Sequence, residues 1–243
     1  MTFSAHRRDW EDLAELDPMW AVLSEPQRQF ARWSAAEFFS TGEDEIADLR
    51  FRLLALGLPD TFGAALDFGC GLGRITRALR VCCSEVVGVD VSEGMIRQAQ
   101  AYTPTCHFVH NPHNDLRIFS SNRFDLAYSR LVLQHQRSAK LITNYVSELV
   151  RVIKPAGLAV FQIPCEIDFL HRMQPRRRIY EVLRSIGMPA KSLYSWGLFP
   201  IWMTSVPEGD VAYAVQRTGG RVIAVESDDS CPGLKNKLYY ATK

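Results

Sequence analysis

Residues 64–79, AALDFGCGLGRITRAL, place three glycines at alternate positions after an apolar run: Gly69, Gly71 and Gly73. A dinucleotide-binding loop has its third glycine one position later, where this chain has Arg74. The segment also lacks the G-K-[ST] of a phosphate-binding P-loop. The spacing therefore indicates a tight turn that brings the backbone close to a ligand without phosphates.

Two aspartates accompany this turn. Asp67 ends the apolar run before the glycines, and Asp90 ends the next one, EVVGVD. A carboxylate beside the turn suits an ammonium group, and one at the end of the following strand suits the two vicinal hydroxyls of a ribose. An amino acid at one end, a ribose in the middle and no phosphate describe S-adenosylmethionine.

The elements that must position these residues alternate between strand and helix from residue 64 onward. Helical patterns cover 72–82, 92–102, 138–153, 172–187 and 207–220. Strand patterns cover 64–69, 85–90, 106–110, 124–129, 158–164, 221–227 and 237–243. The run LAVFQIP is apolar throughout, as expected of a strand buried on both faces. The pattern predicts an α/β fold with a doubly wound, mostly parallel sheet.

The first sixty residues are predicted to be helical and rich in aromatic residues. Ser34 with Glu37, and Thr41 with Asp44, each have the capping-box spacing, so we expect two helix starts. The second helix is expected to end at Gly57. Further along, Pro207 suits a first helical position.

Composition limits the possible partners. The chain has 243 residues, 47% hydrophobic and 23% charged, with a formal net charge of +1. This balance predicts no nucleic-acid or membrane partner. There is no run of transmembrane length and the first ten residues do not resemble a signal peptide, so a cytoplasmic location is expected. The six cysteines, Cys231 among them, form no C-x-x-C pair, which agrees with a reducing compartment.

Four segments in order, ALDFGCGLGRITRAL, EVVGVDVSEGMIRQA, NDLRIFSSNRFDLAYSRLVLQH and LVRVIKPAGLAVFQIP, resemble the motifs of class I S-adenosylmethionine-dependent methyltransferases. The resemblance covers residues 63–164. It implies a Rossmann-like sheet of about seven strands whose last strand is antiparallel, and the aromatic N-terminus resembles the helical lid of bacterial small-molecule methyltransferases. We therefore expect a single domain over 1–243, with a lid (1–60), a cofactor-binding core (61–164), a substrate-side insertion (165–205) and a closing helix and strand pair (206–243).

By the same resemblance, Asp67, Gly69 and Gly71 line the methionine end of the cofactor, and Asp90 holds the ribose. The remaining cofactor-binding residues that we predict are Cys70, Gly73, Val91, Met95, Asn111 and Ser129. Met95 is expected near the adenine, and Ser129 near the sulfonium. The contact to the adenine amino group falls to Asn111, Asn114 or Asp115, and Asn111 is preferred.

Fewer sequence features indicate which residues contact the methyl acceptor. His135 follows the fourth strand where the family often has a histidine facing the methyl group; it is either a general base or a structural histidine bonded to the backbone. The arginine run 176–178 indicates either an anionic substrate or a solvated helix face. The substrate residues predicted here are Trp33, Arg130, Arg177 and Trp202. His107, His110 and His113 lack the spacing of a metal site, and no metal is expected.

The sequence thus predicts methyl transfer from S-adenosylmethionine to a small-molecule acceptor, to a hydroxyl oxygen by preference, with release of S-adenosylhomocysteine. Two alternatives stay open: a cyclase-like enzyme that keeps the cofactor without transferring its methyl group, and a non-catalytic binding partner. A nucleic-acid methyltransferase is disfavoured because the chain lacks an N/D-P-P-Y/F motif near FDLAYS and has no basic excess.

Overall fold

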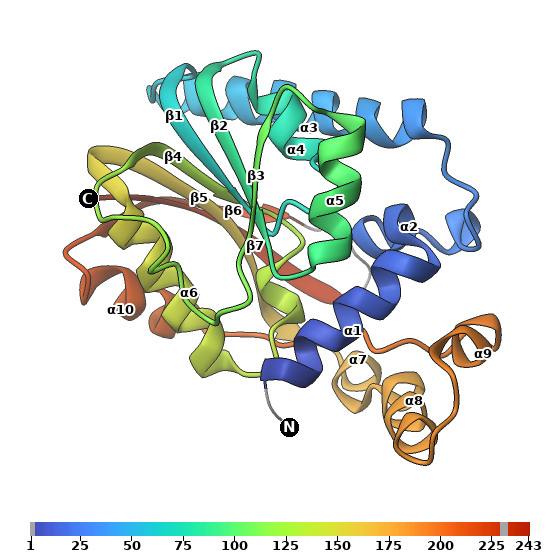
Figure 1. Cartoon of the computed structure of the whole chain (residues 1–243). Coiled ribbons are helices and arrows are strands. Elements are labelled where there is room, and N and C mark those ends of the chain that lie inside the picture. Colours follow the sequence, from blue (N-terminus) through green and yellow to red (C-terminus); the bar gives the residue numbers. More distant parts are fainter. Residues whose placement is uncertain (1–2, 229–232) are drawn as a thin grey trace.

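A computed structural model describes residues 3–228 and 233–243. One twisted sheet crosses the molecule, with helices on both faces (Figure 1). The strands are β1 (Phe62–Phe68), β2 (Cys83–Asp90), β3 (His107–His110), β4 (Phe124–Ser129), β5 (Ile153–Ile167), β6 (Arg221–Asp228) and β7 (Leu234–Thr242).

The sheet has the strand order β3-β2-β1-β4-β5-β7-β6. Strands β1 to β5 pair in parallel, and β7 is antiparallel to both of its neighbours, β5 and β6. The prediction of a seven-stranded, mostly parallel sheet with an antiparallel last strand is confirmed. From β1 the chain adds β2 and β3 on one side of the sheet and then β4 and β5 on the other, so the strand order switches between β1 and β4. Ligands of open α/β sheets bind beside such a switch point.

Helices α3, α4 and α5 cover one face of the sheet, and α6 and α10 cover the other (Figure 1). The helices are α1 (Phe3–Leu16), α2 (Pro18–Val22), α3 (Ala35–Ala55), α4 (Arg74–Leu79), α5 (Glu93–Tyr102), α6 (Ala139–Val152), α7 (Phe169–Met173), α8 (Pro175–Ser185), α9 (Ala190–Ser195) and α10 (Glu208–Gln216), with short 3-10 turns η1 (Pro26–Arg28) and η2 (Leu133–His135). Helix α1 and the excursion α7–α9 lie at the end of the sheet where the parallel strands terminate (Figure 1).

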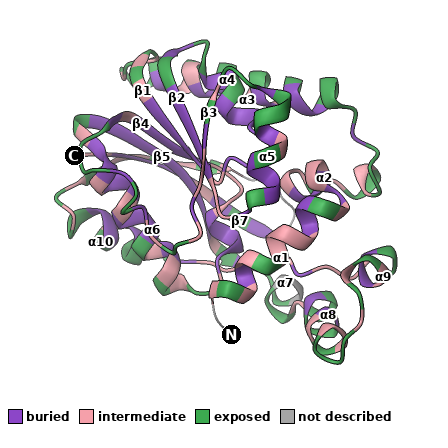
Figure 2. Ribbon diagram, viewed as in Figure 1, coloured by how far each residue is buried: buried purple, intermediate pink, exposed green. Residues whose placement is uncertain are grey.

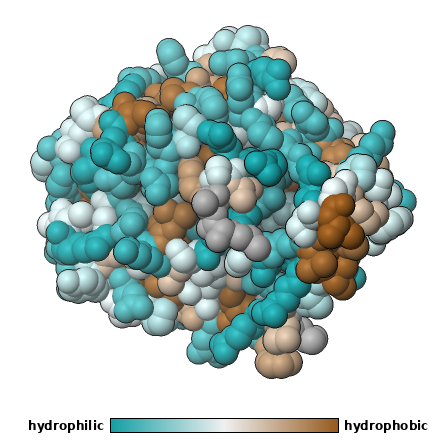
Figure 3. Space-filling model, turned by 60° about the horizontal axis from the view of Figure 1, so that its bottom comes forward, coloured by the Kyte–Doolittle hydropathy of each residue, from teal (hydrophilic) through white to brown (hydrophobic). Residues whose placement is uncertain are grey.

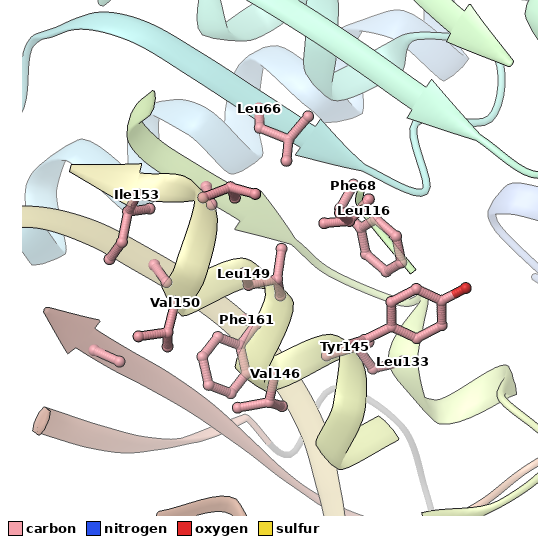
Figure 4. Close-up of a cluster of buried hydrophobic side chains, with 14 of the residues drawn as sticks. Leu66, Phe68, Leu116, Leu133, Tyr145, Val146, Leu149, Val150, Ile153 and Phe161 are labelled. Atoms are coloured by element: carbon pink, nitrogen blue, oxygen red, sulfur yellow. The ribbon is translucent and has the colours of Figure 1, made fainter. Parts of the chain in front are cut away.

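The core fills both faces of the sheet, and the central strands are buried along most of their length (Figure 2). On the α6 face, Tyr145 and Leu149 lie one helical turn apart and pack with Leu66, Phe68 and Phe161 from the strands (Figure 4). Side chains of a strand alternate between faces, so Ala65 packs on the opposite face with α3 and α4. The same alternation decides where Asp67 points.

Some predicted element boundaries were wrong. Ser34 does form a capping box with Glu37, but the second start at Thr41 lies inside one continuous helix, α3. The Thr41 hydroxyl donates to the carbonyl of Phe38 at 2.7 Å, a bond within the helix that replaces the expected cap. Pro207 is the N-cap of α10 and not its first residue. Residues 154–157, which were left between a predicted helix and a predicted strand, lie inside β5, where Ala156 has a φ of 62°.

Within the described residues, no helix has both the length and the apolar composition that a bilayer crossing requires. Cys70, Cys82 and Cys83 are buried free thiols, and Cys231 lies outside the described residues.

Candidate active site

A pocket opens where β1, β2 and β4 end, and it encloses about 780 Å³ of space, part of it open to solvent. Its walls come from the loops after these three strands and from α1, which covers it with Phe3, His6 and Trp10. Seven of the predicted site residues line it: Gly69, Gly71, Asp90, Val91, Met95, Asn111 and Arg130.

The glycine turn forms the floor of the pocket. Gly69, Gly71 and Gly73 have φ values of 76°, 51° and 80°, in the left-handed region that favours glycine. A Cβ at Gly69 would lie 2.4 Å from both methyl groups of Val132, so this position admits no side chain. The turn thus keeps bare backbone against the space where a ligand would lie.

Asp90 presents its carboxylate beside that turn. One oxygen accepts the N–H of Gly71 at 2.9 Å, and the other accepts the N–H of Ser92 at 2.9 Å. Burial raises the pKa of Asp90, although the N–H groups of Ser92 and Gly71 oppose the rise. Each oxygen keeps a lone pair for a further donor, so the carboxylate can take two hydroxyl groups.

Asp67 does not reach the pocket, contrary to the prediction. It shares the α4 face of β1 with Ala65, and its carboxylate accepts the Thr76 hydroxyl at 2.6 Å. Burial raises the pKa of Asp67 to about 7. Its role in the structure is to tie the start of α4 to β1 beneath the glycine turn.

Three other predicted cofactor residues lie behind the pocket wall. Cys70 packs with Ile96 and Phe108 under the turn, and Gly73 caps α4. The fully buried Ser129 hydroxyl donates to the carbonyl of Phe68 at 3.1 Å, and this hydrogen bond links β4 to β1.

Asn111 lines the pocket, but its amide already has partners. Its Nδ2 donates to the carbonyl of Asp115 at 2.6 Å, and its Oδ1 accepts the N–H of His113 at 3.2 Å. These bonds shape the loop after β3. Asp115 itself pairs with Arg117 at the surface.

A buried charge network borders the pocket on the α3 side. Glu45 accepts bonds from Arg74 at 2.8 Å and from the Tyr128 hydroxyl at 2.8 Å, and it lies 3.3 Å from Arg130. Arg130 also pairs with Asp228 at 2.8 Å. Arg74 and Arg130 both line the pocket, and Arg74 Nε is buried without a hydrogen-bond partner among the described residues. Two arginines in the pocket wall fit the carboxylate of an amino-acid ligand.

The lid helix α1 is fastened by Glu11. Its carboxylate accepts the Ser92 hydroxyl at 2.6 Å and the N–H groups of Glu93 and Gly94 at 2.8 and 3.0 Å. Partial burial opposes ionisation, but these bonds together lower the pKa of Glu11. Glu11 of α1 therefore accepts hydrogen bonds from the free N–H groups at the start of α5, the helix that begins just after Asp90.

The predicted acceptor residue His135 is buried next to the lid. Its Nδ1 donates to the carbonyl of Trp202 at 2.8 Å, and its Nε2 lies 3.3 Å from the amide nitrogen of Gln134. Burial lowers the pKa of His135 to about 4, although the bond to Trp202 opposes this. Its ring contacts that of Trp10, with 5.6 Å between centroids, so it supports the lid instead of lining the pocket.

Of the predicted substrate residues, only Arg130 lines the pocket. The Arg177 guanidinium stacks 3.5 Å over the Trp202 ring and pairs with Glu181 at 2.7 Å, so both side chains belong to the support of the lid. Trp33 donates to the carbonyl of Leu23 at 3.3 Å within the aromatic cluster of α2 and α3.

Several pocket features had no local signal in the sequence. Glu11 meets Ser92, which is 81 positions away, and Glu45 meets Arg74 and Arg130 across three elements. Leu131 lines the pocket with a φ of 61°, although it is not a glycine. Gln136 also lines it, and its Oε1 is buried with no partner among the described residues.

Comparisons with known proteins point to methyltransferases. The family described as "Methyltransferase domain" matches residues 66–161. A malonyl-[acyl-carrier protein] O-methyltransferase of Salmonella typhimurium is 34% identical over 119 residues, 47% of this chain and 44% of that protein. A trans-aconitate 2-methyltransferase of Rhodopseudomonas palustris is 27% identical over 140 residues, 57% of this chain and 52% of that protein. The chain spans about half the length of these relatives.

Among solved structures, magnesium protoporphyrin IX methyltransferase from Synechocystis PCC 6803 with bound SAH has a TM-score of 0.63 with this chain, at 17% identity and 100% coverage of both chains. This likeness shows a shared fold. Residues 66–161 therefore form a methyltransferase domain of the class I S-adenosylmethionine-dependent kind, as the motifs in this part of the chain predicted.

Proposed function

We propose that this chain binds S-adenosylmethionine in the pocket and transfers its methyl group to an oxygen atom of a small-molecule acceptor. The observation that carries the proposal is the Asp90 carboxylate, held by the N–H groups of Gly71 and Ser92 beside a turn that admits no Cβ. This arrangement suits a ribose with two free hydroxyl groups, attached to a substituent that carries no phosphate.

The residues present fit each part of that cofactor. Asp90 would hold the ribose hydroxyls, and Val91, Met95 and Asn111 would border the adenine. Arg74 and Arg130, which both line the pocket, would bind the carboxylate of the methionine portion. When bound, the cofactor supplies an electrophilic methyl group on a sulfonium.

The protein's contribution to such a transfer is positioning and exclusion of water. Charge is lost as the methyl group leaves the sulfonium, so a dry and oriented pocket favours the reaction. Helix α1 covers the pocket with aromatic side chains, and Glu11 keeps it in place. In this proposal, residues 1–60 are the lid, 61–164 the cofactor-binding core, 165–205 the acceptor-side insertion and 206–243 the closing helix and strand pair.

We propose a carboxylate oxygen as the acceptor in preference to the hydroxyl expected from the sequence. The hydroxyl required a general base, and His135 donates its Nδ1 proton to Trp202 and does not line the pocket. A carboxylate is already ionised at neutral pH and needs no base. The two relatives named above act on substrates that carry carboxylates, malonyl and trans-aconitate.

Calorimetric titration of the full chain with S-adenosylhomocysteine, S-adenosylmethionine and NAD tests the cofactor site. We expect micromolar binding of the first two, about −8 kcal/mol, and none of NAD. Asp90→Ala should weaken binding at least ~100-fold, because a buried pair of hydrogen bonds to ribose is lost, whereas the exposed Asp44→Ala on α3 should not change it. Absence of binding to a folded sample would refute the proposal.

The acceptor class is tested by incubation with panels of small carboxylic acids and small alcohols. Equal amounts of S-adenosylhomocysteine and methyl ester support a carboxylate acceptor. Methyl ether formation would restore the hydroxyl acceptor, product without S-adenosylhomocysteine would indicate the cyclase-like alternative, and binding without turnover would favour the non-catalytic one.

A further inference from the structure

Helix α8 exposes an apolar stripe between two arginines. Ile179, Val182 and Ile186 are 49%, 63% and 73% exposed and follow one another at helical spacing. Arg176 and Arg178 are exposed on either side of this stripe. We call these five residues the α8 face.

The α8 face contains no acidic side chain. Glu181 is the one acidic residue of this helix, and it is turned inward to Arg177. The excursion around α8 adds more exposed apolar surface, with Phe169 71%, Met173 42% and Trp196 61% exposed. Scattered apolar residues are normal on a protein surface, but this concentration within one excursion of the chain is not. Figure 3 shows the apolar patch in the region of α8, with hydrophilic groups beside it.

The opposite side of α8 is firmly attached to the lid. Arg184 pairs with Asp12 of α1 at 3.1 Å, and the Tyr180 hydroxyl lies 3.4 Å from the same carboxylate. Arg177 is buried over Trp202. These contacts hold the apolar stripe outward, so its exposure is a fixed feature of the fold.

We infer that the α8 face is a peripheral membrane-contact site that takes an anionic lipid surface. A helix with an apolar face bordered by arginines is suited to lie in the headgroup region, with its apolar side chains inserted and its cations on lipid phosphates. No membrane partner was expected from the net charge of +1, because a total over the whole chain hides the local positive charge of the α8 face. The inference does not depend on the proposed function.

Two observations favour lipid over a protein occupant. A second copy docked by the same face would bring Arg176 and Arg178 against their own equivalents, with no acidic residue on the face to offset the repulsion. The hollow beside Ile179 is lined by only Arg178, Ile179, Val182 and Leu183, and does not form a groove for a peptide. A bilayer requires no shape complementarity.

Flotation of the full chain with vesicles tests the inference. We expect binding to phosphatidylcholine vesicles that contain phosphatidylglycerol, weaker binding at high salt and little binding to phosphatidylcholine alone. Arg176→Gln with Arg178→Gln should lower the partition coefficient about 30-fold, since each cation near an anionic surface contributes about fivefold. Val182→Ser with Ile186→Ser should lower it at least ~10-fold.

The matched control is Phe51→Ser with Leu54→Ser on α3, which removes apolar side chains that are 72% and 61% exposed. This variant should bind vesicles like the unmodified chain. All three variants alter exposed residues, and unchanged melting temperatures would verify that they fold. The inference is overturned if the chain does not bind the mixed vesicles, or if the α3 variant loses binding equally. If the chain does not bind vesicles and sedimentation velocity shows that Val182→Ser with Ile186→Ser dissolves a dimer, the α8 face is instead a contact between two copies of the chain.

Discussion

The two sides of the pocket are built by different means. On the cofactor side, backbone N–H groups and left-handed glycines form the surface, and the parts lie between Gly69 and Ser92. On the lid side, charged side chains join segments far apart in sequence, such as Asp9 with Arg137 and Asp12 with Arg184. Backbone geometry close in sequence can be specified by a short motif, whereas the lid side requires the whole fold to form first. The two sides should therefore fail differently when mutated.

Glu45→Gln should have the largest effect, because Glu45 joins Arg74 to Arg130 in the charge network beside the pocket. Removing its charge leaves the buried Arg74 guanidinium without its charged partner, while Arg130 keeps Asp228, and we expect a loss of about 3–5 kcal/mol of unfolding free energy. Urea denaturation measures this. The control is Glu43→Gln, whose pair with Arg77 is exposed and should contribute less than about 1 kcal/mol. Similar losses in both variants would contradict the role assigned to the buried network.

Gly69→Ala probes the backbone side. The new methyl group would overlap both methyl groups of Val132 at a φ of 76°, so we expect about 100-fold weaker binding of S-adenosylhomocysteine. Gly197 has a similar φ of 72° but open space around it, so Gly197→Ala separates strain from overlap. Calorimetry should find binding unchanged in the Gly197 variant. An unchanged affinity at Gly69 would mean that the turn does not form the floor of the cofactor site.

Glu11→Ala tests the point where the two sides meet. It removes the carboxylate that satisfies the start of α5, so we expect a loss of about 1–2 kcal/mol and faster release of S-adenosylhomocysteine. Stopped-flow competition measures the release rate. Glu15→Ala alters an exposed acid on the same helix and should leave that rate unchanged. Equal rates in all three proteins would show that α1 does not retain the ligand.

The pH dependence of the lid side is the smallest effect at neutral pH. His135 has a folded pKa of about 4 against an ordinary value of 6.5, so between these values the unfolded chain binds more protons. The contribution of His135 to stability should therefore fall as the pH drops from about 6.5 to 4, whereas the raised pKa of Asp67 acts in the opposite direction. Buried His6, whose pKa burial lowers to about 3, acts in the same direction as His135.

In His135→Asn, the amide keeps a donor for the Trp202 carbonyl without titrating, so the decline in stability should be shallower. His107→Asn, at an exposed position, should retain the full decline. Melting temperatures across this pH range distinguish the two variants, and identical profiles would remove His135 as a source of the dependence.

The sequence predicted the sheet, its antiparallel last strand and the glycine turn, because apolar periodicity and glycine spacing are local properties. Asp90 is at the pocket because it ends its strand where the sheet opens. Asp67 was misplaced because the motif gives its position along the strand but not the face to which it points. Glu11 and Glu45 were missed because their partners lie far away in the sequence. Leu131 was missed because the neighbouring residues do not predict its positive φ.

Strand β7 follows β6 in the sequence yet lies between β5 and β6 in the sheet. During synthesis on the ribosome, β5 is therefore complete while the strand that pairs with its open edge has not yet been made. Residues 157–164 of β5 are all buried in the finished molecule. A nascent chain paused before residue 234 exposes this apolar edge to strand addition by other chains. The topology thus predicts that the nascent chain is most prone to pairing with other chains in the interval before the final hairpin is complete.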